Sequence, residues 1–206
     1  INYAALDKKS GCREAFIPDN DFLLEIDISA YHPTLAAQLV DYKFEDEDIH
    51  QAFADMYGVD YKKAKELTFK QLYGGVFKEY KELEFFKRVE KYIDDISRKE
   101  EVVCKSGYVF KTDMKKQKLF NYILQNTETY YNVLILEKII KLLKHSKTKI
   151  IHYTYDSFLL DVDKSEKDLI KSILDVFKEY NFNVKVEAGN NYNALVNDIN
   201  FTGNKN

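Results

Sequence analysis

The 206-residue sequence has no tryptophan, only two cysteines and no long apolar run, and each scarcity argues against a class of protein. Cys12 and Cys104 lie far apart and neither belongs to a Cys-x-x-Cys pair, which argues against a disulfide framework and favours a reducing environment inside a cell. No apolar stretch reaches the roughly 18 residues of a membrane-spanning helix, and no signal peptide is visible. We therefore expect a cytoplasmic protein without a membrane partner.

Charge of neither sign dominates, because 31 basic residues face 34 acidic ones and the net charge is −3. The chain thus has no global basic field of the kind that marks many nucleic-acid-binding proteins. Only three basic residues are arginine, so phosphate contacts would fall mostly to lysine. Aromatic residues are abundant instead, with 16 tyrosines and 14 phenylalanines, and they provide both a packed core and flat faces suited to stacking.

The hydrophobic pattern predicts an α+β fold. Residues 21–29 alternate between apolar and polar, which predicts a half-buried strand with Glu25 and Asp27 on its second face. The stretch "KIIHYTYDSFLLDVD" predicts a β-hairpin with Tyr155, Asp156 and Ser157 at its tip. Further strands are expected in "VVCKSGYVFKTD" and "NVKVE", and helices at about 33–40, 47–57, 60–73, 78–99, 115–145 and 165–180. This order, with a helical block inserted, is typical of α+β domains.

Asp27 and Asp156 each lie where an apolar strand gives way to a turn. If the two strands are neighbours, the carboxylates converge and their mutual repulsion requires cations. Two Mg²⁺ ions about 3.5–4 Å apart, held by such a pair, are an arrangement used for in-line phosphoryl transfer. The alternative is that both residues are ordinary turn or capping aspartates.

The segment "DYKKAKELTFKQLYGG" places Tyr61, Lys65, Phe69 and Tyr73 four residues apart, on one face of a helix. Such a lysine can neutralise a triphosphate while a neighbouring ring stacks on a base. The alternative is that the aromatic stripe belongs to the core.

Asn121 and Gln125 lie one turn apart on the long helix, with Lys118 beside them. Amides and a lysine on one face suit a nucleic-acid minor groove, and an ordinary solvated face is the alternative. The four histidines show no metal-ligand spacing, and neither a Gly-x-Ser-x-Gly turn nor a Walker-type loop is present.

Taken together and in order, these features resemble the catalytic core of the family A DNA polymerases, the group related to bacterial DNA polymerase I. The likeness covers nearly the whole chain. It rests on "GCREAFIPDNDFLLEIDISAYHPTLAAQL", "DEDIHQAFADMYGV", "AKELTFKQLYGG", "NYILQNT", "YTYDSFLLDV" and "VKVEAGNNYNAL".

The resemblance implies a polymerase palm, an antiparallel sheet with packed helices, formed by residues 1–40 and 101–206. A helical fingers subdomain would be inserted at 41–100, and a thumb and an exonuclease are not expected in this chain. The implied activity is that of a DNA-directed DNA polymerase, which adds deoxynucleotides to a primer 3′-hydroxyl. The expected setting is replication in the cytoplasm of a bacterial cell or of a phage-infected host.

The same resemblance implies a role for each matching residue. Asp27, Asp156 and Lys65 would be the catalytic residues, and the two aspartates would hold two Mg²⁺ ions, for which Mn²⁺ is an expected substitute. The partners would be primer–template DNA, a dNTP and a separate thumb, processivity or replication protein. The dNTP would be bound by Lys65, Lys62, Phe69, Tyr73 and His32, and the primer–template by Asn121, Gln125, Tyr73, Gly74 and Tyr155.

Four positions depart from the family pattern, and one of them is Tyr155, where the family has a histidine. Tyr61 stands where the family has an arginine, so Lys62 or Lys63 is expected to supply that charge. Ser157 replaces a glutamate near the metals, and His32 replaces the glutamate that screens the sugar. Two alternatives therefore stay open: a polymerase with relaxed sugar or template choice, which makes or copies RNA, and an inactive polymerase-like module that binds nucleic acid.

Overall fold

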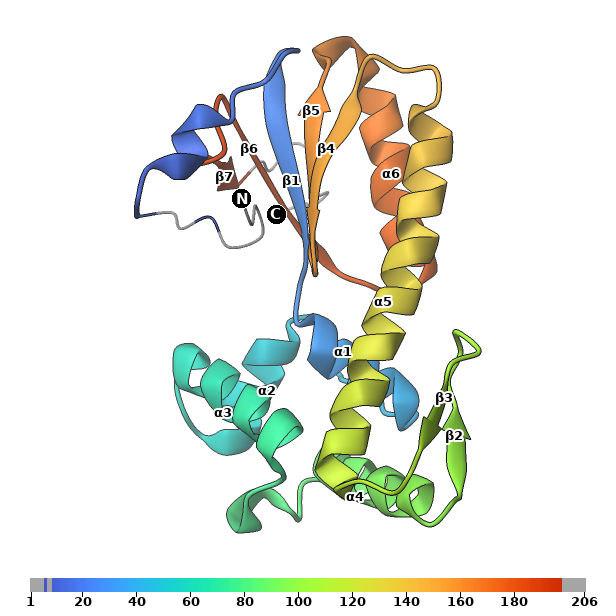
Figure 1. Cartoon of the computed structure of the whole chain (residues 1–206). Coiled ribbons are helices and arrows are strands. Elements are labelled where there is room, and N and C mark those ends of the chain that lie inside the picture. Colours follow the sequence, from blue (N-terminus) through green and yellow to red (C-terminus); the bar gives the residue numbers. More distant parts are fainter. Residues whose placement is uncertain (1–5, 7–8, 198–206) are drawn as a thin grey trace. The chain divides into compact units, whose positions relative to one another are not determined.

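A computed structural model describes residue 6 and residues 9–197, which form a mixed α/β structure with an antiparallel sheet and packed helices (Figure 1). The described chain divides into two compact units. Residues up to Ser29 and from Asn132 onward form the first, and Ala30–Tyr131 forms the second. The long helix α5 (Lys116–Leu143) contributes residues to both. Within the described residues, no helix is both long enough and apolar enough to cross a membrane.

The first unit is built on a five-stranded antiparallel sheet with the order β4-β5-β1-β6-β7. Helix α6 packs on it through an apolar face, and the ring of Phe177 lies 5.3 Å from that of Phe158 on β5. The elements are η2 (Cys12–Ala15), β1 (Phe22–Ile28), β4 (Lys149–Thr154), β5 (Ser157–Val162), η4 (Lys164–Glu166), α6 (Lys167–Glu179), β6 (Val184–Gly189) and β7 (Val196–Asn197). All strand pairs are antiparallel, and β1 lies in the middle of the sheet because it pairs with β5 on one side and β6 on the other.

The prediction that β1 is half-buried is wrong, because both of its faces are covered. Leu23 packs with Leu159 and Tyr192 on the face that was expected to be open, and Glu25 is buried there too. The segment that covers this face follows β6 and contains Tyr192. Gly189, the last residue of β6, permits the close approach of this segment. A Cβ atom at position 189 would lie 2.4 Å from the carbonyl oxygen of Ala194. The sequence pattern of β1 alone carries no sign of this distant segment.

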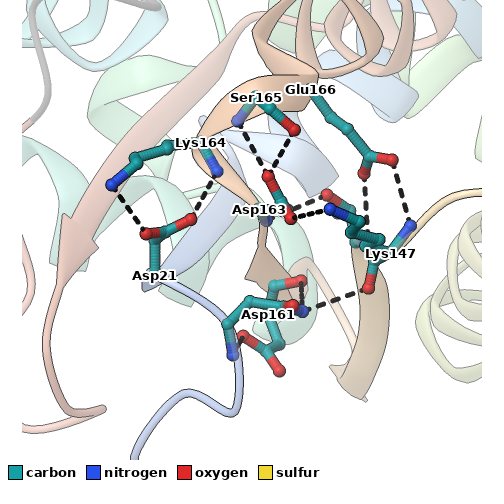
Figure 2. Close-up of polar contacts among 9 residues, drawn as sticks. Asp21, Lys147, Asp161, Asp163, Lys164, Ser165 and Glu166 are labelled. Carbon is teal, nitrogen blue, oxygen red and sulfur yellow. Dashed lines mark hydrogen bonds and ion pairs between the residues drawn. The ribbon is translucent and has the colours of Figure 1, made fainter.

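At the end of the sheet where β1 begins, a cluster of carboxylates links the neighbouring loops and strands through hydrogen bonds and ion pairs (Figure 2). The buried Asp161 accepts hydrogen bonds from the backbone N–H groups of Asp19 and Asn20, at 3.1 and 3.0 Å. Asp163 accepts from the backbone and hydroxyl of Ser165, and these bonds lower the pKa of its carboxyl to about 2. Because these carboxylates bind backbone donors and lysines of this unit, the cluster anchors loops and β1.

The second unit is mainly helical, with a short two-stranded hairpin. Its elements are α1 (Tyr31–Leu39), α2 (Ile49–Tyr57), α3 (Tyr61–Gly74), η3 (Lys78–Tyr80), α4 (Glu84–Ser97), β2 (Glu101–Val103), β3 (Val109–Lys111) and the first part of α5. Phenylalanine rings form its core: the buried ring of Phe53 lies 5.2 Å from that of Phe44 and 5.3 Å from that of Phe85.

Local signals set the ends of α2 and α3. Asp48 caps α2 by accepting from the backbone of His50 and Gln51, and Asp60 caps α3 by accepting from Lys63. Gly58 ends α2 with a positive φ of 64°, which glycine adopts without a steric penalty. The helix expected over 78–99 is shorter than predicted, because residues 78–80 form a 3₁₀ turn and α4 begins only at Glu84.

Candidate active site

The first unit brings Asp27 and Asp156 to the same end of one strand pair. Asp27, next to last in β1, lies opposite Ser157, the first residue of β5. The backbone N–H of Ile28 donates a 2.8 Å hydrogen bond to the carbonyl of Asp156 in the β4–β5 turn. Two aspartates separated by 129 residues (156 − 27) thus lie at adjacent positions of neighbouring strands, at the end opposite the carboxylate cluster. Asp27 is half-buried and Asp156 is exposed.

Asn132, which the sequence analysis missed, holds the turn that carries Asp156. This buried residue of α5 donates from Nδ2 to the hydroxyl of Tyr153 and to the carbonyl of Tyr155, both at 2.7 Å. Tyr155 has a positive φ of 45°, an uncommon conformation for a residue other than glycine. A detectable signal was the lone amide in the apolar run "NVLIL", because a buried amide needs hydrogen-bond partners.

A third carboxylate lies close to the aspartate pair. Glu25 is 8% exposed, and its Oε1 accepts from the Ser157 hydroxyl at 2.6 Å and from the Tyr192 hydroxyl at 3.1 Å. Burial, followed by the charge of Glu25, raises the pKa of Tyr192 to about 12, although the Arg13 guanidinium 4.5 Å above its ring acts in the opposite direction. Glu25 thus lies on the same strand face as Asp27 and is bonded to Ser157 on the neighbouring strand.

Asp27 and Asp156 fit the needs of Mg²⁺. This ion usually binds one or two carboxylates and completes its shell with water and substrate phosphates. Among residues 6 and 9–197, no group of three or more His, Cys, Asp or Glu side chains is arranged to hold a metal, so an all-protein cage is absent from that part of the chain. Two adjacent carboxylates at an exposed strand end suit a site that the substrate completes.

In the second unit, α3 presents the predicted stripe on one face. The rings of Phe69 and Tyr73 are nearly parallel, with an interplanar angle of 7° and centroids 6.0 Å apart. Lys65 and Lys62 are exposed on the same helix, and Gly74 is its last residue. Cationic side chains thus stand on the same helix as flat aromatic surfaces.

His50, at the start of α2, is a second residue that the sequence analysis missed. It is 5% exposed, its Nδ1 has no hydrogen-bond partner, and its ring lies 6.1 Å from that of Phe69. Burial lowers the pKa of His50, and the positive charge of Lys65 lowers it further, against an opposing effect of Asp48. Because this nitrogen is closed to solvent, His50 is a buried neighbour of Phe69 that supports the Lys65–Phe69 face from within. The Asp-Ile-His motif at 48–50 was its signal.

His32, Tyr73 and Asn121 come together in the second unit. The Nε2 of His32 lies 2.9 Å from Oε2 of Glu128, and its Nδ1 is hydrogen-bonded to the Tyr73 hydroxyl. Asn121 donates from Nδ2 to the Tyr73 carbonyl at 3.0 Å, and its buried Oδ1 has no hydrogen-bond partner. Gln125 is exposed one turn further along α5. Tyr155, also predicted to bind primer–template, belongs instead to the first unit, with Asp27 and Asp156.

The fold resembles that of a DNA polymerase domain. The chain matches the POL domain of Pol1 from M. smegmatis, solved in complex with DNA primer-template and dNTP, with a TM-score of 0.72 at 15% identity. The match covers 89% of this chain and 42% of that one, so the chain spans about two fifths of the length of the structure it matches. No protein-family model matches the sequence, and no curated protein sequence is similar to it. The polymerase-like fold expected from the sequence is thereby confirmed.

Proposed function

We propose that this chain is the catalytic core of a family A-like, DNA-dependent DNA polymerase that adds deoxynucleotides to a primer 3′-hydroxyl. The observation that carries the proposal is the adjacency of Asp27 and Asp156 at one end of the β1–β5 pair. The likeness to a solved polymerase domain over 89% of the chain supports it. In this proposal the sheet unit acts as the palm and the helical unit supplies the fingers, whose expected limits were 41 and 100.

The proposed chemistry assigns the two aspartates to metal binding. Two Mg²⁺ ions, when bound, would activate the primer 3′-hydroxyl and neutralise the charge of the triphosphate. The carboxylates of Asp27 and Asp156 hold those cations at the strand end. Asn132 keeps Asp156 in place through the Tyr155 carbonyl, and Glu25 adds negative charge close by while it fixes the Ser157 hydroxyl.

The helical unit is proposed to bind the incoming nucleotide. Lys65 and Lys62 attract the triphosphate, and His50 supports the Lys65–Phe69 face from within, with its ring 6.1 Å from that of Phe69. Phe69 stacks on the base, and Tyr73 lies beside the templating base. The residues that contact the primer–template are Asn121 and Gln125 on α5, Gly74 after Tyr73, and Tyr155 on the sheet unit.

A second candidate function is a polymerase with relaxed sugar choice. The observation that favours it is His32, which stands where the family screens the ribose with a glutamate and is hydrogen-bonded to Tyr73. An imidazole and a carboxylate differ in shape and charge, so the discrimination against a 2′-hydroxyl can differ from that of the family.

Primer extension tests both candidates. The parent chain, Asp27→Ala and Asp156→Ala are assayed on a primed template with Mg²⁺ and either dNTPs or NTPs. Asp175→Ala is the matched control, because Asp175 is an exposed aspartate of the same unit, paired with the nearby Lys178. We expect extension by the parent and the control and its loss in both aspartate variants. Primer–template binding without extension by the parent would favour the inactive module instead.

A further inference from the structure

Glu128 of α5 is the hydrogen-bond partner of His32. The distance from Nε2 of His32 to Oε2 of Glu128 is 2.9 Å, and the two side chains are only 12% and 14% exposed. The Tyr31 hydroxyl also donates to the backbone carbonyl of Glu128, at 3.4 Å, so α1 is joined to α5 at two consecutive residues. All of these residues belong to the second unit. Solvent is largely excluded from this pair, so its hydrogen bond is stronger than one at the open surface.

The contacts of His32 determine which of its nitrogens carries the proton. An ionised carboxylate can only accept, so Nε2 donates to Glu128. In the neutral ring Nδ1 is then an acceptor, and it receives the hydroxyl proton of Tyr73. A ring held at both nitrogens cannot turn over about its own axis. Glu128 therefore determines that the Nδ1 side of the imidazole faces the Tyr73 hydroxyl.

We propose that Glu128 is a positioning residue for sugar selection and acts through His32 on Tyr73. The inference rests on the proposed function and deepens it. Position 32 holds a histidine where the family has the glutamate that screens the sugar. The carboxylate of Glu128 is hydrogen-bonded to Nε2 of this histidine, on the side of the ring away from Tyr73. The rigid barrier next to the nucleotide is thus the His32–Tyr73 pair, and its rigidity depends on Glu128. Loss of this carboxylate frees the ring and lets a ribose be accommodated.

The same geometry makes the effect of His32→Glu depend on Glu128. The single substitution brings a second carboxylate toward Glu128 in a place with little solvent, and like charges there repel. Replacing Glu128 by glutamine removes that repulsion and leaves an amide that can donate to the new carboxylate. The two substitutions must therefore be strongly non-additive.

Single-nucleotide incorporation measures the ratio of kcat/KM for a dNTP to that for the matching NTP. The set is the parent, Glu128→Gln, His32→Glu, the double variant, and Glu137→Gln, a control on the same helix whose carboxylate pairs with Lys141. We expect Glu128→Gln to lower the ratio about tenfold, as the loss of a charge-assisted bond implies. The double variant should regain the ratio that His32→Glu loses, and Glu137→Gln should match the parent. An unchanged ratio in Glu128→Gln, or an additive cycle, would overturn the proposal.

A second readout does not depend on activity. Long-range ¹H–¹⁵N NMR of the ring nitrogens at alkaline pH, where imidazole is neutral, should show His32 protonated at Nε2 in the parent and as a mixture in Glu128→Gln. The same tautomer in both proteins overturns the positioning role. If the parent does not extend a primer but its tautomer depends on Glu128, the proposed function fails and the gate role falls with it, while the contact itself stands.

Discussion

Replacing Asn132 should weaken both the fold and the catalysis, because this one side chain supports the turn that carries Asp156. In Asn132→Ala, the Tyr153 hydroxyl and the Tyr155 carbonyl each lose a 2.7 Å hydrogen bond from Nδ2. In Asn132→Asp, an acceptor faces the Tyr155 carbonyl, so that bond becomes a repulsion. The aspartate variant should therefore be the worse of the two, although its shape is almost unchanged.

The size of the effect follows from these contacts. Each buried hydrogen bond contributes about 1 kcal/mol net, and a carbonyl left without its partner costs about 1–3 kcal/mol. Asn132 is 2% exposed, so water does not readily replace the amide. We expect Asn132→Ala to lower the free energy of unfolding by about 2–3 kcal/mol. A displacement of Asp156 by about 1 Å can lower turnover by roughly a hundredfold.

Urea denaturation measures the first effect, and single-turnover primer extension the second. Asn126→Ala is the matched control, because Asn126 lies on the same helix and its Oδ1 accepts a hydrogen bond from the Ser106 hydroxyl at the exposed surface. It should lose less than about 1 kcal/mol and keep the parent turnover. A stable, fully active Asn132→Ala would refute the role given to this residue.

Three further predictions concern other parts of the molecule. Tyr57→Phe should lower the free energy of unfolding by about 1–3 kcal/mol in urea titrations, because the buried Tyr57 hydroxyl bonds Thr68 and Gln71 at 3.1 Å. The pKa of Asp163 is lowered to about 2 from about 3.8, so its stabilising effect is complete above pH about 4 and is lost as the pH falls toward 2. Unfolding experiments across that range should show a smaller loss in Asp163→Asn than in the parent. Lys65→Ala should raise the KM for dNTP about tenfold in steady-state assays, whereas Lys70→Ala, an exposed lysine off the stripe, should leave it unchanged.

Features set by local sequence could be predicted. The α3 stripe needed only a four-residue spacing, and β1 and the β4–β5 hairpin followed from apolar alternation and a turn. Asp27 and Asp156 were predicted to converge if their strands are neighbours. The strand order places β1 next to β5, so this condition is met.

Features that depend on distant segments could not be predicted. Glu25 and Asp27 share one strand face as expected, but Tyr192, which covers that face, lies 167 residues from Glu25. The contact of Glu128 with His32 spans 96 residues, and neither residue shows an unusual local pattern. Such contacts are set by tertiary packing, which periodicity along the chain does not encode.

A template-directed incorporation assay shows directly whether Asp27 and Asp156 support DNA synthesis. A primed duplex is offered with each of the four templating bases in turn, together with Mg²⁺ and one dNTP at a time, and the product is resolved after a single turnover. We expect addition of the complementary dNTP only, and its loss in Asp27→Asn and in Asp156→Asn, which keep the size of each side chain. Incorporation that ignores the template, or that persists in either variant, would contradict it.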